Sequence, residues 1–231
     1  MKIAVIPARG GSKRLPGKNV KNFCGKPLIQ WTIDAAIESE VFDRVCVSTD
    51  SDEIALVARQ CGAEVPFLRP KELASDTSTT ASALTHFVET LEQQDGLSIS
   101  YVCLLQPTSP LRSAEDIRNA DRLLTGENLD AVISVCELEH PIHWCNRLGP
   151  ELSMKGFTKP AINVDSQDQG VYYRLNGAIY FCRKSVATKL ESLYNDNVES
   201  RAYVMDQISS VDIDTELDFA IAETAISIKR F

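Results

Sequence analysis

Apolar residues in this chain gather in short runs that alternate with segments of helical spacing. The runs Lys2–Ile6 and Tyr101–Leu105 are almost continuously apolar, which is typical of strands covered on both faces. Runs of this kind predict strands over residues 2–6, 44–48, 64–68, 101–105, 131–135, 178–182 and 202–205. Helical spacing predicts helices over residues 28–37, 52–60, 80–94, 114–124, 184–190 and 215–228.

This alternation predicts an α/β fold with a doubly wound, mostly parallel sheet. We expect a single domain over residues 1–231. Residues 137–176 break the rhythm with prolines and glycines and are too long for a simple connection, so we expect an irregular insertion that acts as a lid, a binding loop or a subunit contact. Ligands of such sheets lie beyond the carboxyl ends of the strands, in loops that here start at Pro7, Thr49, Arg69, Gln106 and Cys136.

Composition excludes several classes of protein. The formal net charge of −8 argues against a general nucleic-acid binder, which usually carries a basic face. No apolar run approaches the roughly 18 residues that span a bilayer, and the first apolar run is too short for a signal peptide. The seven cysteines form no CxxC pair, which indicates free thiols in a reducing compartment. We therefore expect a cytoplasmic protein that binds neither nucleic acid nor membranes.

The loop after the first strand, Ile6–Asn19, is rich in glycine and cations. Gly10, Gly11 and Gly17 allow a ligand to approach the backbone, while Arg9 and Lys13 can hold phosphates. The spacing does not match a Walker A loop, and Asn19 stands where that motif has Ser or Thr. It does not match the GxGxxG fingerprint of dinucleotide-binding proteins either. The loop is therefore predicted to bind phosphates in another way.

The loop resembles the signature of sugar nucleotidyltransferases, and four further segments resemble acylneuraminate cytidylyltransferases more narrowly. These four segments are Phe67-Leu68-Arg69-Pro70 with Ser75-Asp76-Thr77, Gln106-Pro107-Thr108-Ser109-Pro110-Leu111-Arg112, Arg174-Leu175-Asn176-Gly177-Ala178-Ile179-Tyr180, and Val211-Asp212-Ile213-Asp214. The resemblance implies a Rossmann-like nucleotidyltransferase fold. It also implies that the anomeric hydroxyl of a nine-carbon acidic sugar attacks the α-phosphate of CTP and displaces pyrophosphate.

The resemblance also implies roles for individual residues. The positions implied for the nucleotide are Arg9, Gly11, Ser12, Lys13, Lys18, Asn19, Arg69, Ser75 and Thr80. The positions implied for the sugar are Gln106, Arg112, Arg174, Asn176 and Tyr180, and those implied for catalysis are Arg9, Lys13, Asp212 and Asp214. Four roles have plain alternatives. The polar cluster at Ser75–Thr80 could cap the helix from Thr80, and Tyr180 could be a core aromatic. Lys13 could be a solvated lysine, and Arg69 could form a surface ion pair.

Asp212 and Asp214 are the candidate metal ligands. In an extended backbone both carboxylates point to one face while Ile213 turns toward the core. Two such carboxylates suit Mg²⁺, with Mn²⁺ as an alternative, once triphosphate oxygens complete the coordination. The competing explanation is that Asp214 favours the amino end of the last helix, where Thr215 to Asp218 resembles a capping box.

Three further functions compete with the first. A synthetase for the eight-carbon acid Kdo would carry an acidic motif after the fourth strand, but no acid lies between Leu104 and Ala114. A nicotinamide dehydrogenase would need GxGxxG, and a non-catalytic homologue would lack the catalytic residues. N-acetylneuraminate, legionaminate and pseudaminate all stay open as substrates. The family is typically dimeric, so we expect a homodimer that uses part of residues 137–173.

Overall fold

The computed structural model describes residues 1–140, 142–157 and 170–229. Its central sheet has six strands in the order β4-β1-β5-β7-β6-β8, with the bounds β1 Lys2–Pro7, β4 Arg44–Ser48, β5 Tyr101–Leu104, β6 Ala131–Glu137, β7 Tyr173–Arg183 and β8 Ser200–Met205. β1 pairs in parallel with β4 and β5, and β6 pairs in parallel with β8. Only β7 among these six runs antiparallel to its neighbours, β5 and β6. The predicted mostly parallel α/β sheet is therefore confirmed.

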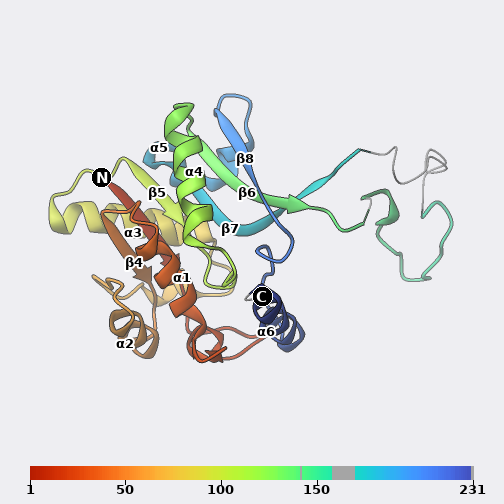
Figure 1. The fold of residues 1–231 in the computed structure, drawn as a ribbon, viewed down its shortest axis with the longest axis horizontal. Coiled ribbons are helices and arrows are strands. Elements are labelled where there is room, and N and C mark those ends of the chain that lie inside the picture. Colours follow the sequence, from red (N-terminus) through yellow and green to blue (C-terminus); the bar gives the residue numbers. More distant parts are fainter. Residues whose placement is uncertain (141, 158–169, 230–231) are drawn as a thin grey trace.

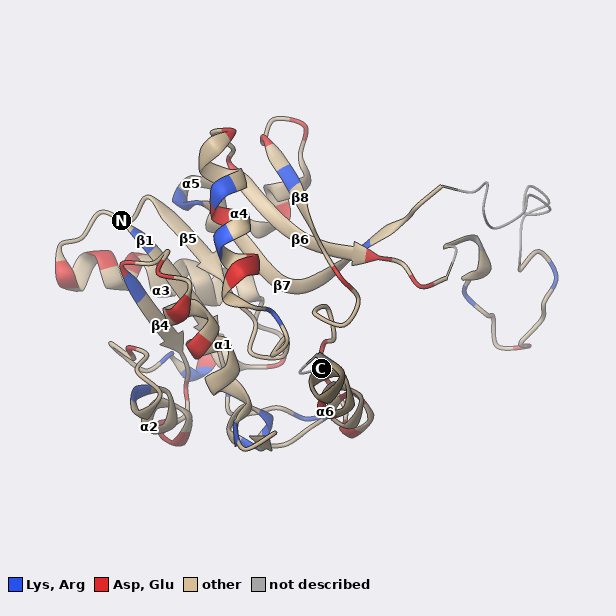
Figure 2. Ribbon diagram, in the orientation of Figure 1, with Lys and Arg blue, Asp and Glu red and all other residues tan. Residues whose placement is uncertain are grey.

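Helices cover both faces of this sheet (Figure 1). One face packs against α1 (Leu28–Glu38), α2 (Asp52–Gln60) and α4 (Ala114–Gly126), while the other packs against α3 (Thr80–Asp95) and the short α5 (Lys184–Ala187). The run in β1 is continuously apolar because both of its faces are buried. Ala4 and Ile6 enter the first core, on the side of α1, α2 and α4, while Ile3 and Val5 enter the second core, on the side of α3. Figure 2 shows that the charged residues lie mainly on helices, loops and strand ends.

A third, smaller core fixes the last helix beside the first loop. α6 (Glu216–Lys229) buries Phe219 and Ala222 against Leu15 and Phe23, and Ile213 joins them with no exposed surface. Phe23 belongs to a small hairpin of β2 (Asn22–Phe23) and β3 (Lys26–Pro27). This packing holds the segment before α6 against the loop that follows β1.

Two elements differ from the sequence prediction. Residues 64–68 do not form a strand: Glu64 makes a single bridge with Cys46, and Pro66 then ends the ladder because it has no N–H to donate. The helix expected over residues 184–190 stops at Ala187, and a 3-10 turn, Leu190–Tyr194, follows.

β7 is longer than predicted and takes in residues 173–176, so the irregular segment spans 138–172. Its described residues lie away from the sheet and helices, beyond the ends of β6 and β7 (Figure 1). They include a 3-10 turn at Ile142–Trp144. The rest of the expected insertion, residues 141 and 158–169, lies outside the described residues. Among the residues that the structure describes, no helix has the length and apolar character to cross a membrane.

Candidate active site

A cleft of about 390 Å³ opens where the carboxyl ends of β1, β4 and β5 meet the segment before α6. This volume suits a nucleotide-sized ligand. Eleven of the residues predicted for the site line it: Arg9, Ser12, Lys13, Lys18, Asn19, Arg69, Ser75, Thr80, Gln106, Asp212 and Asp214. The fold therefore brings together residues more than 200 positions apart, such as Arg9 and Asp212. This agrees with the expectation that ligands bind beyond the carboxyl ends of the strands.

Two cations of the first loop, Arg9 and Lys13, face the same carboxylate across the cleft. Asp76 contacts Lys13 through a 2.5 Å ion pair and Arg9 through one of 3.3 Å. Arg9 also donates a 3.1 Å hydrogen bond to the carbonyl of Ser75. Hydrogen bonding to Lys13 lowers the pKa of Asp76. The side chain of Lys13 is 78% exposed, so a phosphate could replace the carboxylate at little cost.

Arg69 lies beneath the same wall of the cleft and is 7% exposed. Its guanidinium donates to the carbonyl of Ser48 at 2.6 Å and to the Ser48 hydroxyl at 3.1 Å. Burial lowers the pKa of Arg69, because the charged form loses water. Arg69 therefore fixes the end of β4 and brings a positive charge to the cleft.

Asn19 and Lys18 join the first loop to the rest of the site. Asn19 is 4% exposed and donates to the carbonyl of Arg9 at 3.2 Å, while its own carbonyl oxygen has no partner among the described residues. Lys18 contacts Asp214 and the carbonyl of Ile213, each at 2.9 Å.

Gln106 follows β5 directly and forms part of the cleft floor. Its side-chain oxygen accepts a 3.3 Å hydrogen bond from the hydroxyl of Thr108. Gly177 allows Gln106 to lie close, because a Cβ at Gly177 would come within 3.2 Å of that oxygen. Gly177 also has a φ of 75°, a conformation that favours glycine. The Asn-Gly-Ala block on β7 therefore makes room for the Gln-Pro-Thr block.

The two candidate metal ligands have different surroundings. Asp214 is neutralised by Lys18 and by Arg14, which contacts it at 2.8 Å. Asp212 lies beside the Thr108 hydroxyl and forms no ion pair among the described residues. Although Asp212 keeps contact with solvent, crowding by the cleft walls raises its pKa, and the negative charge of Asp214 adds to this effect.

A divalent cation fits this arrangement at Asp212. The carboxylate lacks a cationic partner, a hydroxyl lies beside it, and a second carboxylate is two residues away. The described residues offer no cluster of three or more His, Cys, Asp or Glu side chains, so a cation here would draw its other ligands from substrate and water. Asp214 would have to exchange Arg14 or Lys18 for the cation.

The structure shows which residues cap α3 and α6, and so bears on the capping roles considered for Ser75–Thr80 and for Asp214. Thr79 caps α3 by accepting from Ser82 N at 3.1 Å, so Thr80 is the first helical residue. At α6, Asp218 accepts from Thr215 N at 2.7 Å and Thr215 accepts from Asp218 N at 3.3 Å. This reciprocal pair is a capping box, so the side chain of Asp214 is left to its cations.

Five predicted residues lie outside the cleft lining: Gly11, Arg112, Arg174, Asn176 and Tyr180. Arg174 forms a loose 3.8 Å ion pair with Glu139 near the outer end of β7. Tyr180 packs against the second core, and burial raises its pKa to about 12. Arg112 and Asn176 are almost completely buried.

Two residues of the site carry more weight than the sequence indicated. The Thr108 hydroxyl lies beside both Gln106 and Asp212 and donates to Gln106, while the Thr108 carbonyl accepts from Ile213 N at 2.8 Å. Its place two residues after Gln106 was the signal in the sequence. Asp76 was visible only as part of a polar cluster, because nothing in the sequence reveals that it faces Arg9 and Lys13.

Comparisons with known proteins show which family this chain resembles along its length. The family model described as Cytidylyltransferase matches residues 3–148. A CMP-N,N'-diacetyllegionaminic acid synthase from Legionella pneumophila is 38% identical and covers 99% of this chain and 97% of its own. An N-acylneuraminate cytidylyltransferase from Escherichia coli is 36% identical over 96% of this chain and 51% of its own.

A solved structure of CMP:2-keto-3-deoxy-manno-octonic acid synthetase in complex with CTP has a TM-score of 0.74 at 18% identity, covering 99% of both chains. At that identity the likeness concerns the fold alone.

Proposed function

Because the chain belongs to the cytidylyltransferase family, we propose that it transfers CMP from CTP to the anomeric hydroxyl of a nine-carbon acidic sugar of the nonulosonic class. The observation that carries this proposal is the cleft itself, which is lined together by the basic first loop, by Gln106 and by the carboxylates of Asp212 and Asp214. The similarity to a diacetyllegionaminic acid synthase along nearly the whole of both chains supports the sugar class.

In the proposed reaction the anomeric oxygen forms a bond to the α-phosphorus of CTP. The bond from that phosphorus to the bridging oxygen breaks, pyrophosphate leaves with the bonding electrons, and the hydroxyl proton is released. Arg9 and Lys13 would bind the triphosphate and stabilise the charge that develops on it. Holding both reactants in line lowers the entropic part of the barrier.

We propose Mg²⁺, with Mn²⁺ as an alternative, as the cofactor held by Asp212 and Asp214. A bound divalent cation would polarise the α-phosphate and screen the anionic reactants. The protein's own contribution is to hold Asp212 beside Gln106 through Thr108. The hydrogen bond from Ile213 N to Thr108 keeps the two segments in register.

Pyrophosphate release tests the function. The protein is incubated with CTP, Mg²⁺ and, in turn, N-acetylneuraminate, legionaminate, pseudaminate and Kdo. We expect turnover with at least one nine-carbon acid and strong preference for CTP over UTP and ATP. Turnover with Kdo alone would make the chain a Kdo-type synthetase. No turnover with any acid, despite CTP binding, would make it a non-catalytic homologue.

We also propose a homodimer formed through part of residues 137–173, acting in the cytoplasm. Its support is the group of large apolar side chains that are about half exposed or more on this segment: Trp144, Leu148, Leu152 and Met154. Light scattering at micromolar concentration should give twice the mass of one chain. A monomer would leave the segment as a lid over its own site.

A further inference from the structure

The loop that carries Gln106 is buried, which is unusual for a connection. All residues from Pro107 to Arg112 are buried. Arg112 is 2% exposed, and its Nε and Nη2 have no hydrogen-bond partner among the described residues. The Ser109 hydroxyl is unpartnered too. Orphaned polar groups are rare in folded proteins, and several in one loop call for a physical reason.

Arg112 has no carboxylate partner among the described residues, yet it is charged at neutral pH. Burial lowers its pKa to about 10, which is still well above 7. Among the described residues its only side-chain hydrogen bonds run from Nη1 to the carbonyls of Ser109 at 3.3 Å and Gln106 at 3.5 Å. These are long contacts, so they offset little of the cost of burying the charge.

The two carbonyls do not need the guanidinium. The Gln106 carbonyl also accepts from Ser109 N at 3.3 Å and from the Thr32 hydroxyl at 3.4 Å. The Ser109 carbonyl also accepts from Arg112 N at 3.4 Å. Removing the charged head would therefore leave neither carbonyl without a donor. A role confined to stability does not explain a buried cation here.

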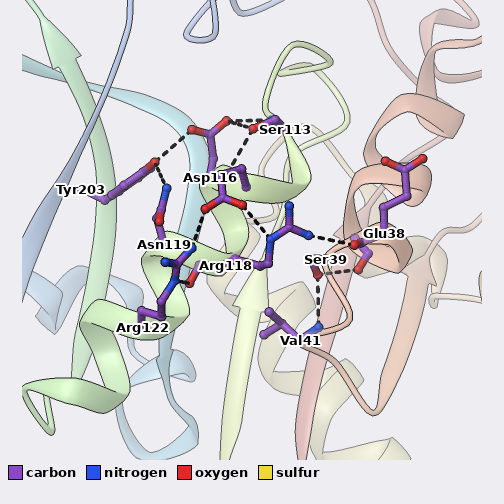
Figure 3. A network of polar contacts seen from close by, with 11 residues as sticks. Glu38, Ser39, Val41, Ser113, Asp116, Arg118, Asn119, Arg122 and Tyr203 are labelled. Atoms are coloured by element: carbon purple, nitrogen blue, oxygen red, sulfur yellow. Dashed lines mark hydrogen bonds and ion pairs between the residues drawn. The ribbon is translucent and has the colours of Figure 1, made fainter.

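The far end of the loop is held independently. Asp116 accepts from Ser113 N at 2.7 Å and Ser113 Oγ at 2.6 Å, and from the Tyr203 hydroxyl at 3.0 Å (Figure 3). This network fixes the start of α4 against β8. Arg112 is thus the charged group next to the Gln106 end of an otherwise anchored loop.

We propose that Arg112 is a positioning residue for the acidic sugar, acting from behind the cleft floor through Gln106 and Thr108. Its uncompensated positive charge favours an anion on the other side of Gln106, and its contacts hold the Gln106 backbone in place. The inference rests on the proposed function, and it assigns Arg112 a role without contact with the ligand. The neighbouring hydrogen bond from Thr108 to Gln106 fixes the carboxamide that faces the sugar.

The test compares Arg112→Met with Arg122→Met, the same change at an exposed arginine of α4. We expect Arg112→Met to be at least as stable to heat as the parent, because it removes an uncompensated buried charge. The KM for the sugar should rise about 10-fold or more while the KM for CTP changes less than about twofold. Arg112→Lys should recover part of the sugar affinity.

A fall in melting temperature with unchanged kinetic constants would overturn the proposal, since Arg112 would then be structural. Unchanged sugar KM in a stable Arg112→Met would overturn it too.

A second readout does not depend on turnover: the side-chain amide signal of Gln106 in ¹⁵N-glutamine-labelled, ligand-free protein, assigned with Gln106→Leu. It should move in Arg112→Met and not in Arg122→Met. If the parent makes no CMP-sugar, the proposed function fails, and this signal still decides whether Arg112 positions Gln106.

Discussion

Replacing Asn176 by alanine should destabilise the protein as well as reduce its activity. Asn176 is 3% exposed and is surrounded by partners on three strands and a loop. Its side-chain oxygen accepts from the Ser134 hydroxyl at 2.6 Å and from Ala178 N at 3.2 Å. Its amide donates to the Ser210 hydroxyl at 2.9 Å. The side chain therefore ties β7 to β6 and to the segment that leads to Asp212.

The magnitude follows from these contacts. The hydrogen bonds to Ser134, Ala178 and Ser210 each contribute about 1 kcal/mol net, and the emptied space adds to the loss. A fourth contact, from the Asn176 amide to the sulfur of Met205 on β8 at 3.3 Å, adds little because sulfur is a weak acceptor. Ser134 and Ser210 keep other partners, so no further large penalty is expected. The total is about 3–4 kcal/mol, which for a chain of this length lowers the melting temperature by roughly 10 °C.

Thermal unfolding followed by far-UV circular dichroism measures this shift, with the exposed Asn197→Ala as control. Pyrophosphate release, measured well below the melting temperatures of the parent and the variant, should also fall. The reason is that the segment from Ser210 to Asp212 loses its hydrogen bond to Asn176 on β7. A melting temperature within about 2 °C of the parent, with a selective loss of sugar affinity, would refute the reasoning. Asn176 would then contact the sugar, as its family resemblance implies, rather than brace the site.

The other predictions concern charges that line the cleft. Lys13→Ala should lower pyrophosphate release by on the order of 100-fold or more without lowering the melting temperature, because it removes a cation from the reacting phosphates. Asp76→Asn should tighten CTP binding several-fold in calorimetry, whereas Glu216→Gln, which frees the distant Lys21, should not. Asp212→Asn should abolish most turnover and shift the remainder to higher Mg²⁺, while normal activity at ordinary Mg²⁺ would place the metal elsewhere.

Asp212→Asn also has a consequence for stability. The pKa of Asp212 is raised in the folded protein. The contribution of Asp212 to stability is therefore greatest below its unfolded-state pKa and is lost as pH rises through the folded-state value. At neutral pH the ionised carboxylate opposes folding, so the asparagine variant should melt no earlier than the parent. An earlier melt at pH 7 would mean that the carboxylate is stabilised by its surroundings.

Much of the fold could be predicted because the strands are covered on both faces. A run such as Ile3–Ile6 must be apolar throughout to lie between two layers of helices, and this pattern is visible in the sequence. The prediction of a strand over residues 64–68 was wrong, because it relied on the apolar pattern and gave too little weight to Pro66, which has no N–H to donate to a neighbouring strand. It also missed the outer half of β7, whose Tyr173-Arg174-Leu175 is exposed and lacks a core-facing pattern.

The site was predictable where residues follow directly from strand ends. Gln106 reaches the cleft because parallel strands deliver their following loops to one edge. Arg69 reaches it from a segment that forms no strand, where its contacts with Ser48 at the end of β4 hold it in place. Arg112 belongs to the same motif as Gln106, yet it points into the protein. Its direction depends on the backbone of a buried, proline-rich turn, which sequence spacing does not encode. A motif shows that a residue type recurs, whereas only the structure distinguishes a ligand contact from the support behind it.

In the free protein, carboxylates in the cleft hold the cations of the first loop in place while leaving them accessible to a ligand. Lys13 is held by Asp76, and Arg14 is held by Asp214, through ion pairs on largely exposed side chains. Exposed pairs contribute little stability and weaken with salt, so an incoming triphosphate exchanges partners at low cost. Arg112 differs because its charge has no partner to exchange. Raising the ionic strength should therefore weaken CTP binding while leaving the contribution of Arg112 to sugar affinity, measured against Arg112→Met, largely intact.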